Sequence, residues 1–309
     1  MRILKNKRTS IGEGPIWNEK EGLLYFVSGF ESEICTYDPR CDEVRVYPQE
    51  VNVAAIAFAA DGRMLVTRAD GAFFLDCKSG ACQPLYDESI KILHCNDAKV
   101  GPDGCFYVGT QSERWRRVSD KADGRLYRIT PSGEVSVVID GLILANGMDW
   151  SVGGERFYIA DTGLSKVLEY EYDLQSGAMR PTGRELPAAG ADGLTVNQND
   201  ELLVALWGKG EIAVVDTHSM TVKKRIATPA RIPASCAFFG EDMKELAITT
   251  ATYHVDIEKD ANAGFICVEA METPGRLPYL FGKNYFYRVI KRCICRSHAL
   301  DPTTVAWCP

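Results

Sequence analysis

Six segments of this chain repeat one pattern, and that repeat limits the possible folds more than any other feature. Each segment reads as a short apolar strand, a Gly-containing turn, a second apolar strand and then a third. Successive segments start roughly 40 to 50 residues apart, which is the length of a four-stranded blade rather than of a helical hairpin. The six starts are Gly14, Ala55, Ala98, Gly147, Gly193 and Cys236.

The segments carry the signals of strands throughout. In the fourth, residues 156–160 follow a turn built on Gly153 and Gly154, and residues 167–172 alternate by side. No stretch has a helical period with caps, which argues against the α/β enzyme classes. A lone blade cannot bury both faces of its sheet, so we predict an all-β fold in which six units close into a six-bladed β-propeller. An open solenoid is the alternative, but it usually needs capping repeats, and the sequence shows none.

Composition indicates an ordinary globular chain with one main domain. The chain has 309 residues, of which 46% are hydrophobic and 25% charged. We expect the propeller to occupy residues 1–282, with Met1 to Arg8 supplying a strand to the last blade, and residues 283–309 to form a C-terminal tail of unknown role. A net charge of −7 without a basic run argues against a nucleic-acid partner. The opening lacks a secretory apolar core and no apolar run is long enough for a bilayer, so we expect a cytoplasmic protein without a membrane partner. The oligomeric state stays open.

The cysteines do not indicate disulfides or a metal cluster in the propeller. There are eleven of them, an odd number, and most fall inside apolar strands without a Cys-x-x-Cys pair. Such residues are usually buried free thiols in a reducing compartment. The tail differs, because it gathers Cys293, Cys295 and Cys308. Without a second pair, this cluster is weak evidence for zinc.

Acidic and amide residues stand directly before four of the six starts. They are Glu13, Asn96-Asp97, Asn146 and Asp192. In a closed ring, equivalent positions face one axis at one end, so these side chains should converge. Glu13, Asn146 and Asp192 would then offer two carboxylates and an amide oxygen to Ca²⁺, Mg²⁺ or Mn²⁺, with Zn²⁺ also possible. Three protein ligands leave positions for water or substrate, as catalysis at a single axial metal site requires.

A plainer interpretation exists for the same residues. Asn and Asp before Gly are common in turns, so Asn146-Gly147 and Asp192-Gly193 could be turn residues only. The restriction of four such positions to one phase of the repeat favours a site. Sequence motifs of nucleophilic hydrolases, phosphate loops and zinc proteases are missing.

Two further positions are candidates for contact with a substrate. His94 lies two residues before Asn96, on a loop expected to face the site, although a lone histidine is more often structural. Residues 112–117 lengthen the third unit and include Arg114 and Trp115. This segment is either a solvated loop or a lid whose Arg114 and Trp115 contact a polyhydroxylated ligand.

Four motifs, in order between about Ile11 and Phe281, resemble the signatures of the gluconolactonase, regucalcin and luciferin-regenerating-enzyme family. This resemblance implies a six-bladed propeller with one divalent metal near its axis, and hydrolysis of aldonic-acid lactones to the free acid. It implies Glu13, Asn146 and Asp192 as metal ligands, Asn96 as a further metal or substrate contact, and Asp192 as general base. The motifs are Gly12-Glu13-Gly14-Pro15-Ile16-Trp17, residues 96–104, residues 146–151 and residues 192–196.

One departure from the family bears on substrate choice. His94 stands where the family often has Arg, and a guanidinium can hold two hydroxyls whereas His offers one nitrogen at a time. We therefore expect a metal-dependent lactonase with an altered sugar preference. The alternatives are a calcium-binding regulatory protein without turnover and a propeller used only as an interaction platform.

Overall fold

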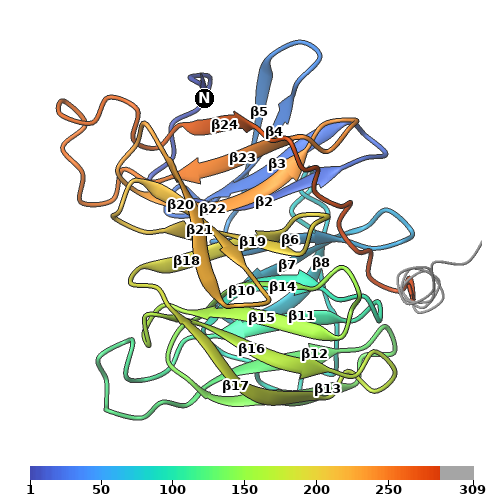
Figure 1. Ribbon diagram of the computed structural model, residues 1–309. Helices are drawn as coiled ribbons and strands as arrows, with labels where there is room; N and C mark the ends of the chain where they lie inside the picture. The colour runs from blue at the N-terminus through green and yellow to red at the C-terminus, as the bar shows by residue number, and fades with distance from the viewer. Residues whose placement is uncertain (286–309) are drawn as a thin grey trace, which may run out of the picture.

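Six antiparallel four-stranded sheets surround one axis in the computed structural model, which describes residues 1–285 (Figure 1). In each sheet the strands follow one another in space as they do in the chain, except at the ring closure. The predicted six-bladed β-propeller is confirmed. The predicted starts of the units fall in the innermost strands of the six blades.

The first three blades run from residue 12 to residue 142. Blade 1 comprises β2 (Gly12–Asn18), β3 (Leu23–Ser28), β4 (Glu33–Asp38) and β5 (Glu43–Pro48). Blade 2 comprises β6 (Ala55–Phe58), β7 (Met64–Arg68), β8 (Gly71–Leu75) and β9 (Cys82–Pro84). Blade 3 comprises β10 (Cys95–Val100), β11 (Phe106–Thr110), β12 (Gly124–Ile129) and β13 (Val135–Leu142).

The last three blades complete the circle. Blade 4 comprises β14 (Ala145–Trp150), β15 (Arg156–Asp161), β16 (Lys166–Tyr172) and β17 (Met179–Pro187). Blade 5 comprises β18 (Ala191–Val196), β19 (Glu201–Leu206), β20 (Glu211–Asp216) and β21 (Thr221–Ala227). Blade 6 comprises β22 (Pro233–Phe239), β23 (Glu245–Thr250), β24 (Ile266–Ala270) and, from the other end of the chain, β1 (Arg2–Leu4).

The hydrophobic core lies between neighbouring blades rather than inside any one of them. Between blades 3 and 4, for example, the ring of Tyr107 meets that of Trp150 at 5.0 Å, and Trp150 meets Phe157 at 4.9 Å. All three side chains are buried. Because each blade buries its faces only against the next one, the ring has to close for the cores to be complete.

Strand β1 closes the ring. Arg2, Ile3 and Leu4 pair antiparallel with Val268, Cys267 and Ile266 of β24. This confirms the prediction that the first residues complete the last blade. The inner strand of blade 6, β22, also contacts β2 of blade 1, so the inner strands touch all the way around the axis.

After β24 the chain crosses the face of the ring that carries the turns between first and second strands. We call residues 271–285 the strap. Its backbone bonds reach blade 5 through Gln198, blade 6 through Met243 and blade 3 through Gly104. In Figure 1 it runs down the right side, opposite the long loop between β23 and β24 on the left.

Arg276 of the strap enters the axis and pairs with Asp149 of β14. The Asp149 carboxylate also accepts bonds from Lys99 Nζ at 3.1 Å and from the backbone nitrogen of Val196 at 3.0 Å. Asp149 is 3% exposed. The neighbouring charges of Arg276 and Lys99 hold the pKa of this carboxyl below its usual value, against the opposing effect of burial. One carboxylate thus connects three inner strands and the strap.

The strap bears on the predicted domain boundary at residue 282. Tyr285 donates a backbone bond to Pro102, so the described part of the predicted tail packs on blade 3. The cysteines of the tail lie outside the described residues, and the boundary stays a prediction. Residues 1–285 contain no helix of the length and apolarity needed to cross a bilayer. A cytoplasmic location stays a prediction as well.

Replacement of Asp149 should destabilise the fold strongly. We expect Asp149→Ala to lower the free energy of unfolding by about 3 kcal/mol or more, because it leaves Arg276 and Lys99 without their shared partner in a buried setting. The matched control is Asp140→Ala, which removes the exposed partner of Arg125 and should cost about 1 kcal/mol or less. Urea unfolding measures both values. Equal losses would contradict the conclusion that the bonds of Asp149 stabilise the fold more than an exposed ion pair does.

Candidate metal centre

Five of the six inner strands have an irregularity near the end where they begin. A register shift interrupts their pairing with the second strand of the blade, and in four of the five it lies beside the acidic and amide positions. Such a bulge bends a strand and redirects the side chains next to it. These four shifts fall between Glu13 and Ile16, Cys95 and Ala98, Ala145 and Met148, and Ala191 and Leu194.

The glycines at two of these bulges allow the inner strands to approach one another closely. A Cβ atom on Gly147 would lie 2.3 Å from the backbone nitrogen of Leu194. One on Gly193 would lie 2.1 Å from Ser235 Oγ. Both glycines lie within strands β14 and β18. The turn interpretation of Asn146-Gly147 and Asp192-Gly193 is therefore wrong, since the glycines serve contacts between strands.

The bulged ends of the strands open into a cavity of about 510 Å³ on the axis. Glu13, Asn96, Asn146 and Asp192 all line it, although they come from four different blades. Asp97, next to Asn96, lines it as well. The structure thus brings together the residues that the repeat predicted to converge, including Asp97, a third carboxylate outside the predicted set of metal ligands.

The three carboxylates repel one another. Removal from water raises the pKa of Glu13 well above its usual value, and the negative charges of Asp192 and Asp97 raise it further. Burial raises the pKa of Asp192 in the same way, with Asp97 adding to the effect and a hydrogen bond from Asn146 opposing it. The pKa of Asp97 is raised by burial too, while Lys99 acts in the other direction. A positive charge among these groups would offset the loss of hydration and the repulsion between the carboxylates, and would lower their pKa values.

The two amides at the cavity are held in place by neighbours. Asn146 donates Nδ2 to Thr162 Oγ1 at 3.1 Å, so its amide oxygen is the atom available to a cation. Asn96 donates Nδ2 to the carbonyl of Ala145 at 3.1 Å and accepts a bond from Gln111 at 3.3 Å. Asn96 is therefore better placed as a neighbour of a cation than as its main ligand.

The donor set fits a divalent cation that prefers oxygen. Asp192 Oδ1 is buried and has no hydrogen-bond partner among the described residues. Leaving such an atom unpaired is costly, and a cation would satisfy it. Within residues 1–285, no three His, Cys, Asp or Glu side chains are arranged to hold a metal ion on their own. A site here consequently needs amide or water oxygens beside the carboxylates, as in the predicted set of Glu13, Asn146 and Asp192.

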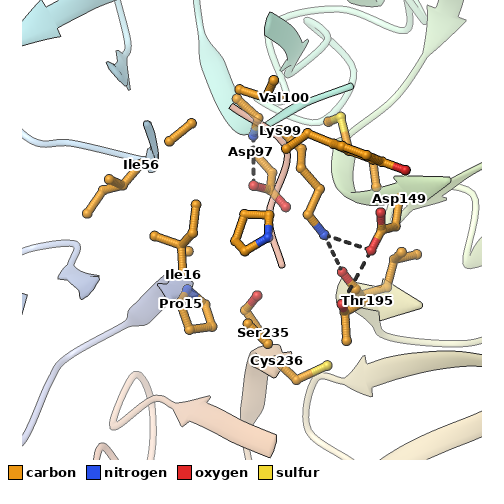
Figure 2. A pocket seen from close by; sticks show the side chains of 18 of the residues that line it. Pro15, Ile16, Ile56, Asp97, Lys99, Val100, Asp149, Thr195, Ser235 and Cys236 are labelled. Carbon is orange, nitrogen blue, oxygen red and sulfur yellow. Dashed lines mark hydrogen bonds and ion pairs between the residues drawn. The ribbon is translucent and has the colours of Figure 1, made fainter. Parts of the chain in front are cut away.

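A second, smaller cavity of about 70 Å³ lies deeper on the axis (Figure 2). Asp97 lines both cavities. Figure 2 shows the Lys99 side chain extending toward Asp149 and Thr195, away from the inner strands of blades 1 and 2. Lys99 is thus the positive charge between the carboxylates of the larger cavity and Asp149.

The other predicted contact residues differ in whether they line the cavity. His94 and Arg114 are not among the described residues that line the cavity, whereas Trp115 of the same loop is. His94 is half-buried with a φ of 59°, and its backbone bonds to Ala69 and Gln111. Substrate contact by His94 or Arg114 stays a prediction. Sequence reasoning placed Asp97 among the residues that converge on the axis but did not name it as a ligand or a substrate contact.

Fold and site together define a six-bladed propeller with an acidic, oxygen-lined cavity at one end of its axis. Comparison with known families agrees with this class. The model of the SMP-30/Gluconolactonase/LRE-like region matches residues 11–252, so the chain belongs to this family. The resemblance predicted from the four motifs is confirmed.

Individual relatives cover almost the whole chain. "Putative sugar lactone lactonase YvrE" from Bacillus subtilis is 31% identical over 284 residues, which span 89% of this chain and 96% of that protein. Regucalcin from Xenopus laevis is 28% identical, over 80% of this chain and 85% of the relative. A crystal structure described as a calcium-binding protein, regucalcin, from Agrobacterium tumefaciens superposes with a TM-score of 0.80. It is 22% identical, covers 91% of this chain and 97% of its own, and shows the shared fold.

Asp192→Asn should change how the protein responds to divalent cations. Without a cation, the variant should unfold at a higher temperature than the wild type, because one of three mutually repelling carboxylates is neutral. With Ca²⁺ or Mn²⁺ at a hundredfold excess over Kd, the wild type should gain about 2.7 kcal/mol and the variant much less. Thermal unfolding with and without chelator measures both. The control Asp87→Asn, at an exposed carboxylate, should behave as the wild type; an unchanged cation response in Asp192→Asn would contradict the site.

Gly193→Ala should weaken both the fold and the cation site. The new Cβ would lie 2.5 Å from Ser235 Cα as well as against its side chain, so β18 and β22 must separate. We expect a loss of about 1 to 3 kcal/mol in stability together with loss of the cation-induced stabilisation. Gly80→Ala is the control, because its φ of 73° makes the substitution strained but nothing lies within 4 Å. It should lower stability and keep the cation response; if Gly193→Ala keeps that response too, the close approach does not govern the site.

Proposed function

We propose that the protein is a metal-dependent lactonase, which hydrolyses a cyclic ester to the open hydroxy acid. The observation that carries the proposal is the buried, unpartnered Asp192 Oδ1 beside Glu13 and Asp97 at the floor of a roomy axial cavity. The membership of a lactonase-like family and the name of the Bacillus relative support the same chemistry. The lactones of aldonic acids, which are sugar lactones, are the first substrates to assay.

A divalent cation is the group that the floor of the cavity fits. Glu13, Asn146 and Asp192 would hold it, with Asn96 at its side. Ca²⁺, Mg²⁺, Mn²⁺ and Zn²⁺ all accept oxygen ligands of this kind, and the calcium-binding description of the Agrobacterium protein makes Ca²⁺ the first to test. When bound, the cation supplies positive charge that polarises a carbonyl and stabilises the oxyanion formed on attack.

The protein groups have separate tasks in the hydrolysis. Water adds to the carbonyl carbon of the lactone, and its proton passes to Asp192 or leaves to solvent while Asp192 orients the water. The bond between the carbonyl carbon and the ring oxygen then breaks, and the ring oxygen takes up a proton. The new carboxylic acid ionises near neutral pH, so each turnover releases one proton. Asn96 lies close enough to the floor of the cavity to position the substrate.

The same ligands would also serve a calcium-binding regulator without turnover, and a propeller used only as a platform would need neither cation nor substrate. These functions differ in what they predict for a purified protein. Cation-dependent acid release favours the lactonase. Cation binding alone favours the regulator, and the absence of both favours the platform.

Asp192→Ala should abolish lactone hydrolysis and leave the fold intact. We expect a loss of about 10² to 10⁴-fold in kcat/KM, because the variant lacks both a cation ligand and the group that handles the proton. Proton release from glucono-1,5-lactone, measured with a pH indicator, gives the rate, and circular dichroism checks the fold. Chelator should abolish the wild-type rate and added cation should restore it. Turnover that survives in Asp192→Ala, with Asp87→Ala as the matched control, would remove the mechanism.

A further inference from the structure

The loops between the second and third strands of all six blades reach the larger cavity and contribute eight of the residues that line it. Two of them, Gly29 and Gln111, directly follow β3 and β11, and we call the other six residues the rim. Four of the six are aromatic. The rim consists of Phe30, Ala69, Trp115, Thr162, Trp207 and Tyr253.

Three of the four aromatic side chains of the rim are exposed, and Trp207 is half-buried. Phe30 is 60% exposed, Trp115 43% and Tyr253 41%. Phe30 and Tyr253 meet edge to face at 5.5 Å between ring centroids, although they come from blades 1 and 6. Exposed apolar surface gathered around a concavity is typical of ligand sites, where a few polar groups are surrounded by apolar walls. Below the rim, Val27, Val53 and Leu144 extend the apolar wall.

The charges of the cavity all have one sign. Among the described residues that line it there is no Lys, Arg or His, while Glu13, Asp97 and Asp192 are acidic. A bound cation would offset part of this charge at the floor, but the wall and rim offer no partner for an anionic substituent. Negatively charged substrates are therefore disfavoured.

Most of the uncharged polar side chains of the cavity are already engaged with other protein groups. Asn96 bonds to Ala145 and Gln111, Asn146 bonds to Thr162, and Asn52 bonds to Ser32. Of the residues expected to contact a sugar, His94 and Arg114 do not line the cavity, whereas Trp115 does. Sugar hydroxyls that reach the aromatic surface of the rim would lack hydrogen-bond partners there, which costs affinity.

We propose that the preferred substrate is an uncharged lactone that carries an apolar alkyl or aryl substituent. This inference rests on the proposed lactonase function and specifies its substrate class. The lactone ring lies at the floor, beside Glu13 and Asp192, and the substituent packs on Phe30, Trp207 and Tyr253 of the rim. The cavity volume lies within the range of about 300 to 1,000 Å³ found for pockets that take small organic ligands.

The expected effect of the substituent is large enough to measure. Each methylene that leaves water for the rim should raise kcat/KM by roughly two- to fourfold, until the aromatic surface is covered. Hydrolysis itself is unchanged: water adds to the carbonyl carbon, the ring C–O bond breaks, and one proton is released per turnover. No further reactant is needed.

The test compares five lactones with the cation-loaded wild-type protein. They are δ-valerolactone, δ-decalactone, dihydrocoumarin, glucono-1,5-lactone and a lactone that bears a free carboxylate. We expect δ-decalactone or dihydrocoumarin to exceed δ-valerolactone and glucono-1,5-lactone by at least about tenfold in kcat/KM, and the charged lactone to be the poorest substrate.

Variants of the rim then test whether its aromatic side chains cause the preference for substituted lactones. Phe30→Ala and Trp207→Ala should each lower kcat/KM for δ-decalactone by about five- to tenfold and change that for δ-valerolactone less than about twofold. The unsubstituted lactone thus reports in the same experiment whether the variant is folded and active. Val137→Ala, which shortens an exposed apolar side chain on the outer strand β13, is the matched control and should change neither value.

The possible failures can be told apart. If glucono-1,5-lactone is the best substrate and the rim variants affect all lactones equally, the substrate inference is overturned while the lactonase function stands. If the cation binds but none of the five lactones is hydrolysed, the proposed function is overturned, and the inference with it.

Discussion

The close approach of the inner strands to one axis is the constraint on which the rest of the structure depends. At β14 and β18 the neighbouring chain lies so near that Gly147 and Gly193 leave no room for a Cβ atom. The bulges that contain these glycines direct the preceding side chains, Asn146 and Asp192, into the cavity. Packing and chemistry therefore rely on the same stretch of backbone, and a change that separates two blades acts on both.

Charge is distributed along the axis in layers. The carboxylates of the larger cavity lie at the wide end of the axis. Lys99 lies below them and pairs with Asp149, which also pairs with Arg276 from the opposite face of the ring. Asp149 has two positive partners, and its pKa lies below the usual value of an aspartate. Among the carboxylates of the cavity, Asp97 is the one whose raised pKa is opposed by the charge of Lys99. The inner layers thus have no excess of negative charge, and the deficit of positive charge is confined to the end that is open to small molecules.

Much of this architecture could be predicted from the sequence, because a repeat of strands places equivalent residues at equivalent depths. Asn146 and Asp192 were found in this way, whereas the strand Arg2–Leu4 lies outside the repeat and was expected only as part of Met1 to Arg8. Arg276 could not be found, since it lies outside every repeat and its partner Asp149 is 127 residues away. Trp207 has no local signature either, because the residue that directly follows the second strand differs between blades and is Gly29 in blade 1. His94 shows the opposite error, because proximity to Asn96 in the chain did not place it on the wall of the cavity.

The pairing of β1 with β24 has a consequence for how the molecule is made. Residues 2–4 have to wait for residues 266–268 before the sixth sheet can form. A ribosome therefore releases most of the polypeptide while the circle is still open and two blade faces remain uncovered. Contacts of such long sequence separation slow folding. During synthesis, the nascent protein would be most vulnerable to aggregation shortly before its last strand emerges.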